Sequence, residues 1–277
     1  MVFSNLFFLY FFLPLNLICY FLAKSIHVRN GILIVFSLFF YAWGEPRYVP
    51  LLVGMVLINW IFGLMIEKYR GQKLAKAGLI GACICSLTLL GIFKYLTLIL
   101  GTTHDLFGLP SVVPQILLPI GISFYTFQTI SYVLDVYRGQ VAAQKRYYKY
   151  LMYLSSYHQL VAGPIVRYSD VAAEIENRTV SAQDFSEGIT RFCLGLTKKV
   201  VVANVAGSLA GNYLDADLAS LSVAGAWFGV LLYTLQIYYD FSAYSDMAIG
   251  LGRMFGFHYH QNFNYPYCLL YTSDAAD

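Results

Sequence analysis

The chain has 277 residues, of which 58% are hydrophobic and only 12% are charged, and its formal net charge is +3. Soluble domains are about 45–50% apolar and about 25% charged. The composition therefore excludes an ordinary soluble domain. The net charge does not indicate a nucleic-acid partner, because the basic residues are expected to set the orientation in the membrane. We predict an all-α, polytopic helical membrane protein.

Long uncharged stretches give the predicted membrane elements. A helix needs about 20 apolar residues to cross a bilayer. Four stretches offer about this length or more: residues 2–23, 48–66, 106–134 and 218–239. The first is expected to be a retained helix, because no Lys or Arg precedes it and no small-residue cleavage site follows it. With the shorter segments, the chain predicts about seven or eight membrane segments.

Two features lie close to the second predicted span. Residues 30–44 form an uncharged stretch that is too short for an ordinary span, so we expect a tight or partly re-entrant helix there. Gly44-Glu45-Pro46 follows directly and predicts a tight hairpin into the next span.

Basic residues predict the orientation of the chain in the membrane. The loops after the first, third and fifth hydrophobic segments hold ten of them, whereas the hairpin after the second segment holds only Arg47. The ten are Lys24, Arg29, Lys68, Arg70, Lys73, Lys76, Arg138, Lys145, Arg146 and Lys149. Loops rich in Lys and Arg face the cytoplasm. We therefore expect a multi-pass protein of the bacterial inner membrane with its N-terminus outside.

The middle of the chain contains two breaks in the helical pattern. Residues 101–119 contain two glycines and three prolines, which predicts broken backbone rather than one helix. Residues 150–166 are apolar but short and end in Ala162-Gly163-Pro164, which predicts a half-membrane element. At membrane depth such backbone must be buried in protein or line a wet cavity. Further on, Ser181 and Asp184 have the spacing of a helix N-cap.

The five cysteines do not predict a disulfide framework or a metal site. Cys83 and Cys85 are too close together for an ordinary disulfide, and they lack the spacing of zinc ligands. We favour packing roles, because a buried free cysteine behaves as a small hydrophobe. No metal is predicted.

Polar side chains at membrane depth are costly and therefore mark candidate functional sites. The densest group lies toward the end of the chain. At helical spacing Gln236, Asp240 and Tyr244 share one face, whereas Asp246 and Arg253 share another. Two interpretations stay open. These residues satisfy partners within a folded bundle, or they form a polar lining for a substrate path.

A second group surrounds the Gly-Pro break. His158 and Gln159 precede it in an apolar helix, and Arg167 follows it. A lone histidine in such a helix is more often a satisfied structural residue than a base, and the arginine could simply snorkel to an interface. The chain has no G-x-S-x-G, H-E-x-x-H or P-loop motif, and no base is paired with a nucleophile. We assign no catalytic residue.

Several strings together make a specific resemblance. They occur in the order MVFSNLFFLYFFLPL, FYAWGEPRYV, LPIGISFYTFQTISYVLDVYRG, LVAGPIVRY, RFCLGLTKKVVVANV, LQIYYDFSAYSDMAIGLGRMFGF and NFNYPY. With these strings, residues 1–267 closely resemble the bacterial alginate O-acetyltransferase branch of the membrane-bound O-acyltransferase family. The chain departs from the usual family pattern at Tyr157-His158-Gln159, at Ala243 and at His260-Gln261-Asn262.

The resemblance implies a ring of helices around a central channel, with a catalytic histidine near that channel. It implies an acyl donor, acetyl-CoA or a similar compound, used from the cytoplasmic side. The acceptor would be an exported, alginate-like polysaccharide, and a periplasmic acetyltransferase would be the partner protein. The alternatives are D-alanyl or other acyl transfer to teichoic acid, lipid or protein, or a non-enzymatic transporter, although no internal repeat supports the last.

The end of the chain does not continue the family pattern. In the family, NFNYPY is followed by a Phe-Trp-Arg-Arg-Trp-His segment and a Leu-Trp-His-Gly segment that carries the essential histidine. Both would lie beyond Tyr267, where this chain instead has CLLYTSDAAD. We therefore expect residues 1–267 to be the N-terminal part of a single membrane domain whose C-terminal part is missing. Residues 268–277 would be a translated sequencing adapter, and this fragment alone would be inactive.

Overall fold

The computed structural model describes residues 2–107, 117–160, 166–216 and 221–263. Every regular element among these residues is a helix, which confirms the all-α prediction. The chain forms two compact units. The first contains the described residues between 19 and 177, and the second contains residues 2–18 together with those from 178 onward. The predicted adapter, residues 268–277, lies outside the described residues.

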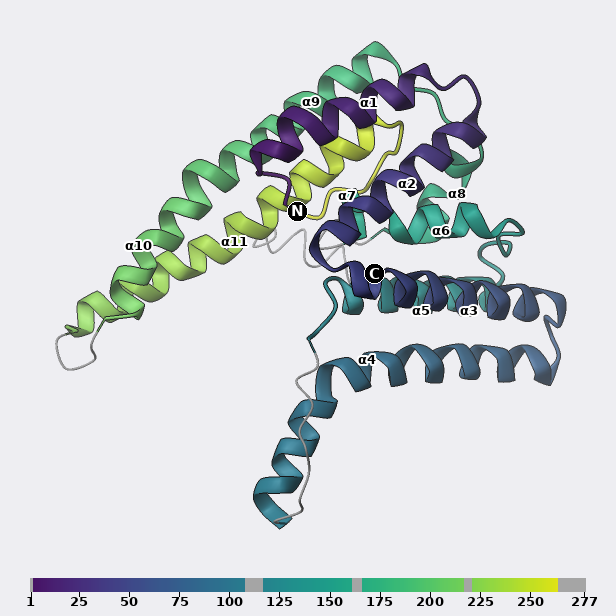
Figure 1. The fold of residues 1–277 in the computed structure, drawn as a ribbon, viewed down its shortest axis with the longest axis horizontal. Helices are drawn as coiled ribbons and strands as arrows, with labels where there is room; N and C mark the ends of the chain where they lie inside the picture. The colour runs from purple at the N-terminus through teal and green to yellow at the C-terminus, as the bar shows by residue number, and fades with distance from the viewer. Residues whose placement is uncertain (1, 108–116, 161–165, 217–220, 264–277) are drawn as a thin grey trace, which may run out of the picture. The chain divides into compact units, whose positions relative to one another are not determined.

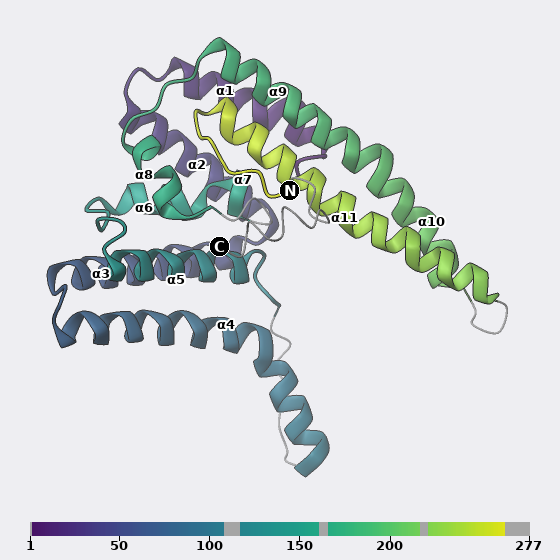
Figure 2. The same cartoon turned by 180° about the vertical axis from the view of Figure 1, so that it is seen from behind.

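Long helices form one side of the first unit. They are α2 (Ile26–Gly44), α3 (Val49–Lys68), α4 (Lys73–Phe107) and α5 (Ile122–Arg138). The last three pack against one another and lie side by side in Figures 1 and 2. The backbone of α3 approaches α5 closely, because a Cβ atom on Gly63 would lie only 2.9 Å from the Tyr132 ring.

Short helices complete the first unit around a tyrosine cluster. They are α6 (Tyr147–Ser155), α7 (Tyr157–Leu160) and α8 (Tyr168–Glu176). The rings of Tyr132 and Tyr150 lie 4.4 Å apart, and Tyr168 meets Tyr132 edge-on at 5.0 Å. The break between α6 and α7 confirms that this apolar stretch is not one full span, while residues 161–165 lie outside the described chain.

Two antiparallel helical columns dominate the second unit. One consists of α9 (Ala182–Thr197), the π-helical turn η3 (Lys198–Ala203) and α10 (Asn204–Leu214). The other is α11 (Val223–Met254). Both views show them side by side over much of their length (Figures 1 and 2). The π-helical turn η1 (Phe8–Phe12) and most of α1 (Leu13–Leu22) also belong to this unit.

The structure corrects the prediction for residues 30–44. Helix α2 begins earlier, at Ile26, and its N-cap Ser25 accepts a hydrogen bond from the Val28 amide at 3.3 Å. The helix has 19 residues and is long enough to cross a membrane, so the tight or re-entrant reading is wrong. The predicted stretch began four residues too late because His27 and Arg29, which are polar, occupy the first turn of the helix.

The predicted hairpin and the first predicted break have different outcomes. Helix α2 ends at Gly44, and the short 3₁₀ turn η2 (Pro46–Tyr48) leads into α3, as Gly44-Glu45-Pro46 predicted. Helix α4 continues to Phe107, so the break does not begin at Gly101 as expected. Residues 108–116 lie outside the described chain.

Four helices in the described part of the chain are long and apolar enough to cross a membrane. They are Ile26–Gly44, Pro46–Lys68, Lys73–Thr102 and Ala182–Leu214. Large apolar side chains lie exposed on the helices, for example Leu98 on α4 and Trp227 on α11, as lipid contact requires. The larger count of seven or eight segments, the ring and the channel stay predictions.

Candidate functional site

The site is built on α9, and residues next to the start of this helix determine where it begins. The Ser181 hydroxyl accepts a hydrogen bond from the Asp184 amide at 3.0 Å, and the Asp184 carboxylate accepts one from the Ser181 amide at 3.3 Å. This reciprocal capping box satisfies two amides that a helix start leaves unpaired. The predicted N-cap is confirmed, and it fixes where α9 begins along α11.

Small residues bring α9 and α11 into backbone contact. A Cβ atom on Gly188 would lie 2.8 Å from the carbonyl oxygen of Gly250, and one on Gly195 would lie 2.7 Å from that of Ala243. Distances below 3.0 Å leave no space for a side chain. The two helices therefore approach closely enough for their polar side chains to pair across the seam.

Asp246 lies at the centre of an ion-pair network across this seam. One carboxylate oxygen accepts hydrogen bonds from two nitrogens of Arg191, at 3.1 and 3.0 Å. The other oxygen accepts a hydrogen bond from the Lys198 ammonium at 2.6 Å. The Asp246 side chain is only 14% exposed, so this pairing compensates a largely buried charge.

Arg253 has different partners from Asp246, although the two share a face of α11. Its guanidinium pairs with Asp184 at 3.5 Å and with Glu187, both in the first turns of α9. Both Asp246 and Arg253 therefore have charged partners on α9, and the lining of a substrate path stays a prediction.

A second group of paired polar side chains lies nearer the N-terminus of α11. The Lys199 ammonium donates to one Asp240 oxygen at 2.6 Å, and the Gln236 amide donates to the other at 3.3 Å. The hydrogen bond within α11 confirms that Gln236 and Asp240 share a face. Sequence reasoning did not select Lys198 and Lys199 as site residues, although two consecutive lysines within an apolar helix were the available signal.

Gln236, Asp240 and Tyr244 line one open hollow on α11. This cavity of about 370 Å³ is completed by Tyr233, Ile237 and Phe241. The Tyr244 ring stacks on Phe3 with centroids 4.7 Å apart. The three residues predicted to share a face therefore meet in one place, where an amide, a carboxylate and apolar rings surround the hollow. Such a surface suits a ligand that has both hydroxyl groups and apolar ring faces.

The second predicted group belongs to the first unit. His158 is fully buried in α7, with its ring 5.3 Å from that of Tyr157. Gln159 is also buried and donates its side-chain amide to the Tyr153 carbonyl. Arg167 lies exposed at the start of α8, where its backbone amide donates to Asp170 at 3.1 Å. The structure thus keeps His158 and Gln159 together within the packed interior and leaves Arg167 at the surface.

The described residues offer no ready metal site. No group of three or more His, Cys, Asp and Glu side chains comes together among them. Cys19, Cys83, Cys85 and Cys193 are free thiols.

Comparisons with known proteins agree on one family. The model of the membrane-bound O-acyltransferase family matches residues 143–274. The "Probable alginate O-acetylase AlgI" of Pseudomonas aeruginosa is 40% identical over 96% of this chain and 52% of that protein. The protein of the same name from Azotobacter vinelandii is also 40% identical, over 96% of this chain and 54% of its own length.

A relative that is named for a different activity gives the same assignment. The peptidoglycan O-acetyltransferase of Helicobacter pylori is 31% identical over 99% of this chain and 58% of that protein. The chain spans about half the length of the curated relatives that it matches. The matches to these relatives cover nearly all of the chain, and the chain belongs to the membrane-bound O-acyltransferase family.

Proposed function

We propose that a full-length protein carrying this chain O-acetylates an exported bacterial polysaccharide. The observation that carries the proposal is the 40% identity to alginate O-acetylases over 96% of the chain. Family membership favours acyl transfer over the alternative of a transporter. Because the chain covers only about half of these relatives, the activity is assigned to the full-length protein and not to the fragment.

The reaction moves an acetyl group from a thioester to a hydroxyl group. In our proposal acetyl-CoA, or a similar thioester, is used from the cytoplasmic side. The acyl carbon leaves the thioester sulfur and bonds to an acceptor oxygen, whose proton passes to the departing thiol. The histidine that assists this proton transfer would lie beyond Tyr267, and a periplasmic acetyltransferase would assist as the partner protein.

The polar seam between α9 and α11 is our candidate for a substrate path. Asp246 lies in the C-terminal third of α11, and Asp240 lies near the middle of the helix. Asp240 is paired on one oxygen by Lys199, yet its side chain is still 36% exposed at the hollow. A fixed, partly open carboxylate can orient a hydroxyl group without moving itself.

A carbohydrate is the acceptor that this combination favours. Sugar hydroxyls match the Gln236 amide and the Asp240 carboxylate, and sugar faces pack on aromatic rings such as Tyr244. Two relatives are named for the acetylation of alginate and of peptidoglycan, and both of these acceptors are glycans with hydroxyl groups. Transfer of D-alanine to teichoic acid, or of an acyl group to lipid or protein, is the runner-up.

Restoration of polymer acetylation tests the proposal. A full-length protein carrying this chain is expressed in an alginate producer that lacks its own acetylase, and ester-linked acetate on the secreted polymer is measured. We expect acetate to reappear, and Asp240→Asn to lower it about tenfold, because a hydrogen bond to a charged group is lost. Asp215→Asn is the matched control, since Asp215 lies exposed at the end of α10.

Protein levels in the membrane are measured for every variant. Absence of polymer acetate with normal membrane levels would overturn the proposed function. Equal acetate in Asp240→Asn and in the unchanged protein would remove the α9–α11 seam from the substrate path and leave the activity assignment intact.

A further inference from the structure

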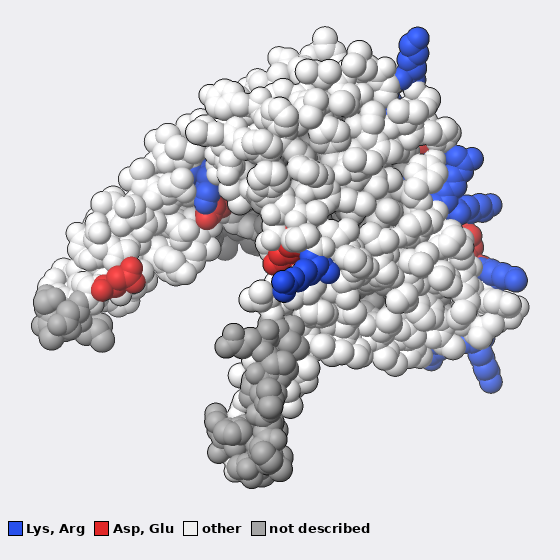
Figure 3. Space-filling view, in the orientation of Figure 1, with Lys and Arg blue, Asp and Glu red and all other residues white. Residues whose placement is uncertain are grey.

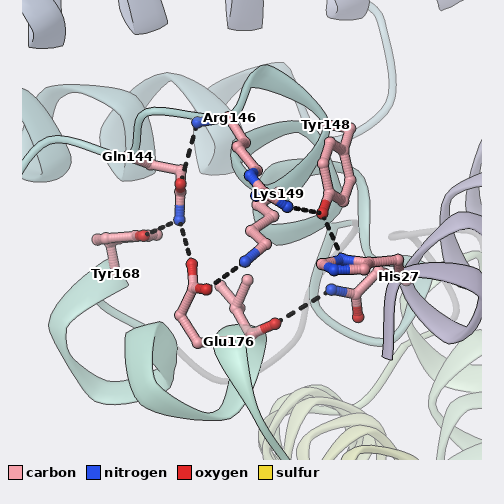
Figure 4. A network of polar contacts seen from close by, with 9 residues as sticks. His27, Gln144, Arg146, Tyr148, Lys149, Tyr168 and Glu176 are labelled. Carbon is pink, nitrogen blue, oxygen red and sulfur yellow. Dashed lines mark hydrogen bonds and ion pairs between the residues drawn. The ribbon is translucent and has the colours of Figure 1, made fainter. Parts of the chain in front are cut away.

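A basic cavity lies in the first unit, remote in sequence from the α9–α11 seam. It measures about 660 Å³ and is formed by the start of α2, the loop between α5 and α6, and α8. Its lining includes His27, Lys145, Arg146, Lys149 and Glu176. Figure 4 shows how the polar side chains around it are connected.

The charges around this cavity do not cancel. Glu176 is the only acidic residue in the described lining. Its carboxylate already accepts hydrogen bonds from the Lys149 ammonium and, at 3.0 Å, from the side-chain amide of Gln144. Lys145 is exposed and has no ion-pair partner among the described residues. The Arg146 guanidinium donates to the Tyr148 hydroxyl at 3.5 Å, and its backbone amide donates to the Gln144 side chain at 3.1 Å. Three cations, Lys145, Arg146 and Lys149, and one carboxylate, Glu176, line the cavity, so its lining carries a net charge of +2.

The loop that carries these charges is held in place. The backbone amide of Gln144 donates to the Tyr132 hydroxyl at 2.9 Å, and the Trp60 indole donates to the backbone carbonyl of Gln144 at 2.7 Å. The Ala143 amide donates to the Glu67 carboxylate at 3.0 Å. Contacts from α3 and α5 thus fix the loop, so little conformational entropy would be lost when a ligand binds.

Hydrogen-bond donors in the cavity lining, with Tyr148 beside it, are arranged for an oxygen-rich anion. His27 Nδ1 lies 2.8 Å from the Tyr148 hydroxyl, which places an imidazole and a phenol beside Arg146 (Figure 4). Arginine, lysine and hydroxyl groups together suit phosphate oxygens, since the guanidinium offers a planar pair of donors and the ammonium a point charge.

The position of the cavity indicates the depth at which its ligand lies. Ile26 and His27 line it, and Ile26 is the first residue of a helix long enough to cross a membrane. The end of such a helix lies at the level of the lipid headgroups. Figure 3 shows Lys and Arg side chains along the edge of this unit where the α5–α6 loop lies, as expected for a surface facing anionic lipid.

We infer that this cavity binds a phosphate group, and that the phosphate is the headgroup of an anionic phospholipid. Lys145 and Arg146 would neutralise it, while His27 and Tyr148, which are hydrogen-bonded to each other, would offer one further donor between them. The inference goes beyond the proposed function and does not depend on it. A soluble phosphorylated compound offers the same phosphate chemistry, so the experiment separates the two sources.

Lipid binding to the purified chain tests the inference. The chain is placed in nanodiscs of phosphatidylcholine with or without phosphatidylglycerol, and retained phosphatidylglycerol is quantified by native mass spectrometry after release into detergent. We expect retained phosphatidylglycerol to fall about tenfold in the K145A/R146A double variant, since two charge-assisted contacts are lost. K73A/K76A is the matched control, because it removes equal charge from exposed residues outside the cavity.

A second arm uses inorganic phosphate and adenosine 3′,5′-bisphosphate as soluble probes in phosphatidylcholine nanodiscs. Selective loss of phosphatidylglycerol in K145A/R146A, with weak soluble binding, supports the lipid site. Tight soluble binding that K145A/R146A alone abolishes, without selective lipid retention, would overturn the lipid source. Equal lipid retention in both double variants would overturn the site. Each result is independent of acetylation activity.

Discussion

Lys149 is a buried cation whose partner lies near the surface. Its side chain is 4% exposed, whereas that of Glu176 is 54% exposed. The Lys149 hydrogen bond, helped by the one from Gln144, holds the pKa of Glu176 below its usual value. A buried charge without a partner is far more costly than an exposed one. Loss of the ion pair would therefore destabilise the buried Lys149 ammonium more than the exposed Glu176 carboxylate.

Replacing Glu176 should change both stability and its dependence on pH. We expect Glu176→Gln to lower the free energy of unfolding by about 1–3 kcal/mol, because Lys149 loses a charged acceptor. Since the folded pKa is lowered, the stabilisation is fully present above the unfolded value of 4.5 and is lost as pH falls through the folded value.

Thermal melts in detergent at neutral and acidic pH measure this effect. The unchanged protein should lose melting temperature on acidification below about pH 4.5, and Glu176→Gln should lose less. Asp170→Asn is not a suitable control, because that carboxylate accepts from the Arg167 amide. Identical acid sensitivity in both proteins would show that Glu176 does not stabilise Lys149.

Single residues were predictable where their partners lie nearby in sequence. The Ser181–Asp184 cap and the Gln236–Asp240 face follow from helical spacing alone. The pairing of Asp246 with Arg191 and Lys198 did not, because it joins residues separated by about 50 positions and needs the α9–α11 packing. The charged lining of the basic cavity was missed for the same reason.

At the scale of elements, close packing of α9 and α11 depends on residues without side chains. Gly195→Ala should push the helices apart, because the new Cβ atom would lie 2.7 Å from the Ala243 carbonyl oxygen. Overpacking of this kind costs about 1–3 kcal/mol. We expect a lower melting temperature and weaker pairing of Asp246 with Lys198.

Gly91→Ala is the matched control for this prediction. Gly91 also lies inside a long helix, but a Cβ atom there would meet nothing within 4 Å. Melts of the two purified variants give the comparison. If both variants melt together, the seam is not tightly packed and the glycine contact is unimportant.

Element boundaries show where sequence patterns are weak. The hairpin after Gly44 was predicted because glycine and proline act locally. The start of α2 was missed because the uncharged stretch begins only after Arg29. The helix itself begins earlier, since a membrane helix extends into the headgroup region with its polar first turn.

For the whole molecule, family membership was the strongest sequence prediction, and the comparisons confirm it. Long consecutive motifs identify a family even where they leave its geometry undefined. The orientation in the membrane stays a prediction, based on ten basic residues in alternate loops against one in the hairpin.

Cysteine accessibility in intact cells tests the orientation. In a cysteine-free background, Arg47→Cys should react with a membrane-impermeant maleimide, whereas Gln72→Cys and Gln140→Cys should react only after the cells are opened. All three positions are exposed, so burial does not limit labelling. The reverse pattern would place the N-terminus inside and would also move the basic cavity to the outer face.

The π-helical turn η3 makes the second unit tolerant of a particular kind of genetic change. A π turn holds one residue more than an α turn of nearly the same length. Loss of a single codon between 198 and 203 would therefore leave a regular helix of almost unchanged length. The helix after it would keep its rotational register, so Gly207 would still meet Gln236 closely. Loss of one residue from the regular turns of α9 or α10 would instead rotate everything after it by about 100°. Natural one-residue deletions in this column should therefore fall within η3.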